Sequence, residues 1–183
     1  MLVKDIISLA CDFTEHEEIA TKIKNEQTLT EEETLVEESL VNCLNLVRDE
    51  IALSAVPLVM SKEVKTEDFK IEYSSLTGKV LDIVNVTDTK GRSVKYKKFD
   101  NYLLAFASNV IVTYKAQPEK LTYQSEFVSV LPERVYAYGV AREFYFLRSL
   151  FDDADIWQAR FEDALNLLLG NKREIRLPRR RWI

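Results

Sequence analysis

The first sixty residues follow a helical pattern of apolar and polar positions. Short amphipathic segments run over 3–11 and 14–25, and a longer one follows Thr30. Thr30 and Glu33 have the spacing of a capping box, and Pro57 marks the expected end of the longer helix. Its apolar residues recur every three or four positions, which predicts one buried face. They are Val36, Leu40, Cys43, Leu44, Val47, Ile51 and Ala55. We therefore predict that residues 1–60 are helical.

The period changes to two between residues 66 and 127. Phe69, Ile71 and Tyr73 alternate with charged residues, which is typical of a half-buried strand. Gly91 supplies a turn residue within a polar hairpin connection over 87–92. Further strands are predicted over 80–86, 94–99, 102–106 and 110–114. Short strands at this spacing predict a small antiparallel sheet or sandwich.

The pattern becomes helical again over 128–171. Pro132 and Glu133 suit a first helical turn, and Gly170 suits a helix end. The acidic stretch 151–155 is expected to separate two helices. The second helix is predicted to bury Ile156, Trp157, Phe161, Ala164, Leu165 and Leu168. The predicted fold class is α+β, in which a helical domain of residues 1–60 and 128–171 is interrupted by a β insertion module at 66–127.

The charge of the chain is divided unevenly. The whole chain has a net charge of −5, but residues 172–183 carry six basic groups and one acid. This segment is predicted to be an extended basic tail that docks on an acidic surface, because guanidinium groups pair with carboxylates and tryptophan is a large apolar anchor. A solvated tail without function is the alternative. The candidate partner-binding residues are Arg176, Pro178, Arg179, Arg180, Arg181, Trp182 and Ile183.

A second basic group lies in and after the predicted hairpin. We expect it to meet an acidic patch on another subunit, and its members are Lys90, Arg92, Lys95, Lys97 and Lys98. The nearby aromatic residues suggest either stacking of nucleic-acid bases or, as we prefer, core positions of alternating strands. These aromatic residues are Tyr96, Phe99, Tyr102, Phe106 and Tyr114.

Residues with catalytic or metal-binding potential are sparse. His16 is flanked by glutamates and is expected to be solvated. Asp152, Asp153 and Asp155 lack the order of a calcium loop and better suit a helix N-cap cluster. Glycine-rich phosphate loops and nucleophile motifs are absent from the sequence. We therefore predict no catalytic residues, no metal and no cofactor.

Two further patterns concern the cell compartment. Cys11 and Cys43 lie in apolar, helix-like segments and are expected to be reduced core residues. The N-terminal segment does not have the pattern of a signal peptide, and no apolar run approaches the roughly 20 residues of a membrane span. A soluble intracellular product is expected.

The C-terminal third resembles a known family. Three segments carry the resemblance: Leu131-Pro-Glu-Arg-Val-Tyr-Ala-Tyr-Gly-Val-Ala-Arg-Glu-Phe-Tyr-Phe, then Asp155-Ile-Trp-Gln-Ala-Arg-Phe-Glu-Asp-Ala-Leu, and the ending Leu177-Pro-Arg-Arg-Arg-Trp182. Their pattern is similar to that of tailed-bacteriophage head–tail connector (adaptor or neck) proteins. The resemblance extends over about 30–183 in the order of elements. It implies helices around a β insertion, a homo-oligomeric ring of about twelve copies beneath the portal, and a C-terminal segment that binds the portal.

This resemblance implies a structural virion protein. It would link the portal protein to tail or neck proteins and pass DNA through its lumen without specific binding. It would reside in the virion neck, after assembly in the cytoplasm of the bacterial host, with no membrane partner. Two other classes remain open. One is a small interaction or regulatory module whose basic tail binds nucleic acid or an acidic protein, and the other is an enzyme whose site forms only on folding.

Overall fold

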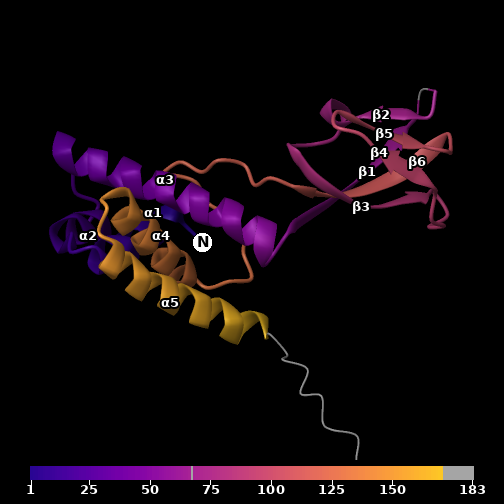
Figure 1. Ribbon diagram of the computed structural model, residues 1–183. Coiled ribbons are helices and arrows are strands. Elements are labelled where there is room, and N and C mark those ends of the chain that lie inside the picture. Colours follow the sequence, from indigo (N-terminus) through magenta and orange to yellow (C-terminus); the bar gives the residue numbers. More distant parts are fainter. Residues whose placement is uncertain (67, 171–183) are drawn as a thin grey trace, which may run out of the picture. The chain divides into compact units, whose positions relative to one another are not determined.

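The computed structural model describes residues 1–66 and 68–170 and has an α+β fold (Figure 1). The chain divides into two compact units. Among the described residues, the helical unit consists of residues 1–44 and 122–170, and the β unit lies within residues 45–121. The predicted α+β class is therefore confirmed.

The helical unit is built on packing of α4 against α1 and α5, and of α1 against α2. α1 is amphipathic and buries Ile6, Ile7 and Cys11, among others. In the described residues its helices are α1 (Val3–Phe13), α2 (Glu17–Lys24), the first part of α3 (Glu31–Ser54), α4 (Glu133–Leu147) and α5 (Phe151–Leu169). The ring of Phe13 stacks on Trp157 at 4.8 Å and on Tyr138 at 5.4 Å, so an aromatic cluster joins α1, α4 and α5.

The predicted capping box begins α3. The backbone N–H of Thr30 donates to Glu33 Oε2 at 2.8 Å, and the N–H of Glu33 donates to Thr30 Oγ1 at 3.3 Å. Lys22 Nζ also donates to both carboxylate oxygens of Glu33, at 2.6 and 2.8 Å. The Lys22 hydrogen bond, together with the Thr30 N–H, lowers the pKa of Glu33 below its ordinary value of 4.5. Glu33 thus caps the N-terminus of α3 and, through Lys22, links α3 to α2.

Replacing Glu33 with glutamine should reduce the acid sensitivity of the helical unit. Because the pKa of Glu33 is lowered on folding, its carboxylate stabilises the fold above pH 4.5, and this contribution is lost as the pH falls through the folded-state pKa. The thermal midpoint of the Glu33→Gln variant should therefore decline less steeply than that of the wild type below pH 4.5. Glu32→Gln, in the same helical turn but outside the capping box, is the matched control. Equal slopes for wild type and Glu33→Gln would contradict the assignment.

In its described residues, the β unit contains two three-stranded antiparallel sheets, with strand orders β1-β6-β3 and β2-β5-β4. Their strands are β1 (Leu58–Lys65), β2 (Lys70–Glu72), β3 (Val80–Asp88), β4 (Tyr96–Lys98), β5 (Tyr102–Ala105) and β6 (Asn109–Ala116), with a 3₁₀ turn over Tyr73–Ser75. The predicted hairpin turn is present, since Asp88 N–H donates to the Arg92 carbonyl at 2.8 Å and Gly91 has a φ of 78°.

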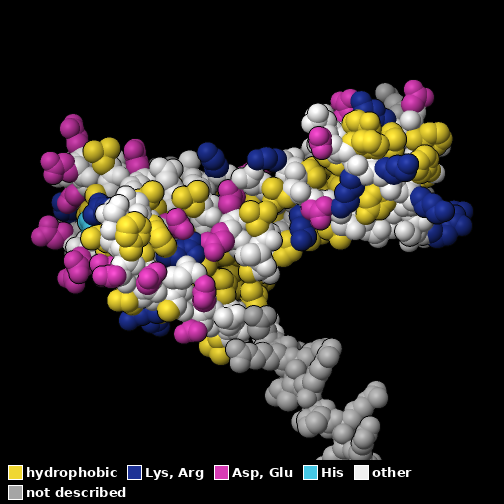
Figure 2. Space-filling view, in the orientation of Figure 1, with side chains coloured by type: hydrophobic (Ala, Val, Ile, Leu, Met, Phe, Trp, Pro, Cys, Tyr) yellow, Lys and Arg dark blue, Asp and Glu magenta, His cyan; other side chains and the backbone are white. Residues whose placement is uncertain are grey.

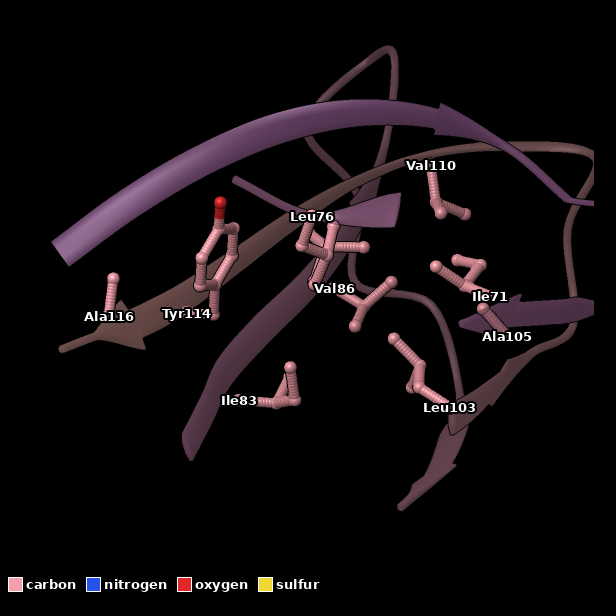
Figure 3. Close-up of a cluster of buried hydrophobic side chains, with 10 residues drawn as sticks. Ile71, Leu76, Ile83, Val86, Leu103, Ala105, Val110, Tyr114 and Ala116 are labelled. Atoms are coloured by element: carbon pink, nitrogen blue, oxygen red, sulfur yellow. The ribbon is translucent and has the colours of Figure 1, made fainter. Parts of the chain in front are cut away.

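One hydrophobic cluster fills the β unit, and both sheets contribute to it (Figure 3). Tyr114 lies in this cluster with no exposed surface, and its hydroxyl pairs with the N–H and the carbonyl of Thr77, each at 3.0 Å. The hydroxyl is therefore satisfied although the ring is buried. The cluster consists of Ile71, Leu76, Ile83, Val86, Leu103, Ala105, Val110, Val112, Tyr114 and Ala116.

The structure corrects the predicted end of the first helical block. α3 ends at Ser54, and Leu58–Lys65 is strand β1 rather than helix or linker. β1 pairs with β6 along its whole length, from Leu58↔Ala116 to Lys65↔Asn109. It lies at the edge of its sheet and carries Lys62, Glu63 and Lys65, so its strand pattern is weak, as is common at sheet edges.

The predicted break between the last two helices is also displaced. Ser149, with a φ of 59°, and Leu150 form the turn, and the acidic stretch expected to be the break is the first turn of α5. α5 buries Ala154 and Phe161 fully, and Trp157 and Leu165 in part. Ile156 and Leu168 were predicted on this face but are exposed. The end of α5 agrees with the prediction, because Gly170 adopts the left-handed conformation.

The last residues of the β unit, 117–121, lie along the second half of α3, which belongs to the same unit. The Asn45 side chain accepts from Leu121 N–H at 2.8 Å and donates to its carbonyl at 3.0 Å, and Gln117 Nε2 donates to Asp49 at 2.8 Å. In the helical unit, Met1 and Phe127 exchange backbone hydrogen bonds. Within the residues described, no helix is both long and apolar enough to cross a bilayer.

Candidate functional site

The two units differ sharply in charge. Residues 1–44 and 122–170 carry 19 acids and 7 bases, a net charge of −12, whereas residues 45–121 carry 10 acids and 12 bases, a net charge of +2. Acidic side chains gather at the end of the helical unit where α2 and the start of α3 lie, while basic side chains are frequent on the β unit (Figure 2).

The acidic end of the helical unit contains a hollow of about 540 Å³. Its acids come mainly from the N-terminal turns of α2 and α3, where the helix dipole favours negative charge. Lys24 Nζ pairs with Asp12 at 2.9 Å, and Lys22 pairs with Glu33. The hollow is lined by Asp12, Glu15, His16, Glu17, Glu18, Ile19, Glu32, Glu33 and Val36.

His16 is more enclosed than the sequence predicted. It stands at the N-cap of α2, its Nδ1 lies 2.5 Å from the carbonyl oxygen of Thr14, and its ring meets Phe144 edge-on at 5.4 Å. The side chain is half-buried, so the expectation of a solvated imidazole is wrong. Among the described residues, no group of three or more histidine, cysteine or acidic side chains is arranged to hold a metal ion.

Both cysteines lie in the core, as predicted. Cys11 and Cys43 are buried free thiols, and burial raises the pKa of each to about 12. A thiol with such a pKa stays protonated at neutral pH and is a poor nucleophile. The two cysteines therefore act as apolar packing residues.

The acids before the last helix have a structural role. Asp152 and Asp153 are exposed in the first turn of α5, where the positive end of the helix dipole stabilises their negative charges. The N-cap itself is Leu150, without a side-chain cap, so these aspartates are not capping residues. This corrects the prediction that they form an N-cap cluster.

The basic group of the β unit is partly neutralised. Arg92 Nε donates to Asp88 Oδ2 at 2.9 Å, and Lys98 Nζ donates to Asp82 Oδ1 at 2.7 Å and to the Ile83 carbonyl at 2.8 Å. The Asp82 hydrogen bond raises the pKa of Lys98, and the Lys98 hydrogen bond lowers that of Asp82. The other three lysines predicted as contacts, Lys90, Lys95 and Lys97, are exposed. All five side chains are exposed, and two of them, Arg92 and Lys98, form ion pairs with aspartates.

The aromatic residues of the β unit were predicted to occupy core positions. Tyr114 is indeed buried, but Phe99 and Phe106 are exposed, as is Phe69. β5 is apolar on both faces, with Leu103 and Ala105 buried and Tyr102 and Leu104 partly exposed. When a strand is apolar on both faces, its sequence does not indicate which face packs in the core. The exposed aromatic surface was therefore missed.

The predicted tail residues, from Arg176 to Ile183, lie outside the described part of the chain. A scan of protein-family models and a search of curated proteins found no match to this sequence.

Proposed function

We propose that this protein is a structural head–tail connector of a tailed bacteriophage, whose copies form a ring that links the portal to the tail. The proposal rests on the family resemblance of residues 131–183 and on the physical character of the two units. DNA would pass through the lumen of this ring without specific binding.

The observation that carries the proposal is the division of charge. A helical unit of net charge −12 and a β unit of net charge +2 with exposed lysines can attract each other between copies of one chain. Contacts between unlike surfaces are heterologous, and such contacts close into rings when the rotation between copies permits. Self-association without catalysis suits a structural role.

The basic C-terminal segment supplies a second, separate contact in this proposal. Residues 172–183 follow the end of α5 and carry a net charge of +5. Arg179, Arg180 and Arg181 would pair with carboxylates of the portal, and Trp182 would fill an apolar pocket. An arginine or tryptophan anchor of this kind often contributes about 2 kcal/mol or more to an interface.

Deletion of residues 173–183 should abolish portal binding without unfolding the protein. The expected result is a soluble variant with the thermal midpoint of the wild type that no longer co-purifies with the phage's portal protein. Trp182→Ala should remove much of the binding alone, and Arg180→Lys should be milder than Arg180→Ala because an ammonium cannot form the bidentate fork of a guanidinium.

The measurement is a pull-down with portal, accompanied by complementation of a phage that lacks the gene and a count of tailed particles. The charge reversal Lys4→Glu, on α1, serves as a control for a change of net charge away from the tail. If the truncated protein binds portal and supports a normal number of tailed particles, the proposed role of the tail is wrong.

A further inference from the structure

The outer face of the β2-β5-β4 sheet exposes an unusual amount of aromatic surface. Ile71, Leu103 and Ala105 of this sheet are buried in the core. Because side chains alternate along a strand, Tyr102 and Leu104 of β5 project from the opposite face. Phe69, Phe99 and Phe106 flank the strands and are 50%, 41% and 56% exposed. These five residues form what we call the aromatic face.

The aromatic face is ordered and is flanked by lysines. Phe99 stacks on Tyr102 with ring centroids 4.6 Å apart, and Phe106 lies 6.2 Å from Phe69. Leu104 is opposite Lys70 on β2 and opposite Lys97 on β4, so the three residues form a row across the sheet. Lys70 Nζ also lies 4.9 Å from the centre of the Tyr102 ring. An apolar centre therefore has cations on both sides.

Over its described strands, the β1-β6-β3 sheet does not have an exposed aromatic surface of this kind. The outward residues of β1 and β6 include the pair Ser61 and Thr113, whose hydroxyls are 3.0 Å apart, and the neighbouring pair Glu63 and Ile111. The large exposed apolar residues of this sheet are aliphatic rather than aromatic, and they are Leu58, Val59 and Val84. The exposed phenylalanines of the β unit thus gather at one sheet, and an exposed apolar patch of this kind indicates an interaction surface.

A complementary surface is present on the helical unit of the same chain. The turn between α4 and α5 exposes Phe146, Leu147, Leu150 and Phe151, which are 43%, 63%, 46% and 56% exposed. The rings of Phe146 and Phe151 pack edge-on at 5.9 Å. The next two residues are the exposed Asp152 and Asp153. This α4–α5 turn thus has an apolar centre beside two acids, while its exposed cation, Arg148, lies over the Phe144 ring at 3.9 Å.

We propose that the aromatic face of one copy binds the α4–α5 turn of a second copy, with Lys70 and Lys97 opposite Asp152 and Asp153. The contact joins two different surfaces, so each copy uses both of them and the assembly propagates from copy to copy. This inference rests on the proposed function, because it specifies the contact that would build the ring.

Single-stranded nucleic acid is the other occupant that aromatic rings and lysines accept. The structure favours a protein surface because Glu72, opposite Tyr102 on the aromatic face, carries a carboxylate bound to Lys70 at 2.9 Å. That carboxylate would repel phosphates and would neutralise one of the two central lysines. An apolar protein surface with a few acids would be repelled less by the Glu72 carboxylate, because it carries fewer negative charges than a nucleic-acid backbone.

The test uses two full-length variants with reversed charges. Lys70→Glu with Lys97→Glu makes the aromatic face acidic, and Asp152→Lys with Asp153→Lys makes the turn basic. Each variant alone should self-associate at least about tenfold more weakly than the wild type in sedimentation velocity, since like charges then meet. An equal mixture should recover the association of the wild type, because the two variants can alternate with every contact matched.

Matched controls come from the β1-β6-β3 sheet. Lys65→Glu with Lys115→Glu makes the same change of charge on the outer face of β1 and β6, and it should leave self-association unchanged. Phe106→Ser should weaken self-association, whereas Val59→Ser, at an exposed position of β1, should not. Far-ultraviolet circular dichroism establishes that each variant is folded.

Three results would overturn the inference. The first is a wild-type chain that stays monomeric at its solubility limit, and the second is a mixture of the two variants that fails to recover association. The third is binding of oligothymidylate that is lost in Lys70→Glu with Lys97→Glu, which would assign the aromatic face to single-stranded nucleic acid. Portal binding by the tail is measured separately, so any of these results leaves the proposed connector function to be judged by the pull-down.

Discussion

Replacing Phe161 with alanine is expected to destabilise the helical unit by roughly 3–5 kcal/mol, the usual cost of removing a buried aromatic side chain. Phe161 is 1% exposed and is the largest side chain that α5 buries. The guanidinium of Arg142 lies 5.0 Å from the centre of its ring, and Arg142 in turn donates to Gln158 of α5 at 2.8 Å. Loss of the ring would leave a cavity beside a buried charge, which adds to the cost.

The Phe161→Ala effect can be measured by urea unfolding followed through Trp157 fluorescence in a Trp182→Phe background. Ile156→Ala is the control, because the sequence placed Ile156 on the same buried face but the structure leaves it exposed. Its expected effect is within about 0.5 kcal/mol, as for most surface substitutions. Similar losses for the two variants would show that the buried face of α5 is assigned incorrectly.

Replacing Tyr114 with alanine is expected to destabilise the β unit by a similar amount, roughly 3–5 kcal/mol. Tyr114 has no exposed surface, its ring fills the cluster between the two sheets, and its hydroxyl makes both hydrogen bonds to Thr77. Tyr114→Phe keeps the ring but removes the hydroxyl. Because Thr77 is exposed and water can replace the lost partner, this variant should lose only about 1 kcal/mol.

Hydrogen exchange read by mass spectrometry distinguishes these outcomes, since it reports the β-unit amides separately from those of the helices. Amides of β3 and β6 should exchange much faster in Tyr114→Ala and only slightly faster in Tyr114→Phe. Equal acceleration in both variants would mean that the hydrogen bonds, rather than the buried ring, supply the stability.

The candidate surfaces were predictable to different degrees. The basic tail and the lysines near the hairpin are visible in the sequence because charge runs need no knowledge of folding. Their pairing was not visible, since Lys98 meets Asp82 and Arg92 meets Asp88 only once the strands are placed. The aromatic face was missed because Tyr102, Leu103, Leu104, Ala105 and Phe106 are all apolar. A continuous apolar run carries no information about which side is covered.

The sequence by itself determined the features that depend on near neighbours in the chain. The capping box of Thr30 and Glu33, the hairpin turn at Gly91 and the helix end at Gly170 were all predicted, because each depends on spacing or on backbone conformation within a few residues. The order of helices, strands and helices followed from the change of hydrophobic period, so the α+β class was predictable as well.

Only the tertiary structure decided the features that depend on distant segments. β1 is a strand because β6, some fifty residues later, supplies its hydrogen-bond partners. α5 has apolar residues around much of its circumference, so packing against α4 selected Ala154 and Phe161 for burial and left Ile156 and Leu168 in solvent. Local pattern sets the conformation of each segment, whereas burial is a property of pairs of segments, and a single segment does not specify its partner.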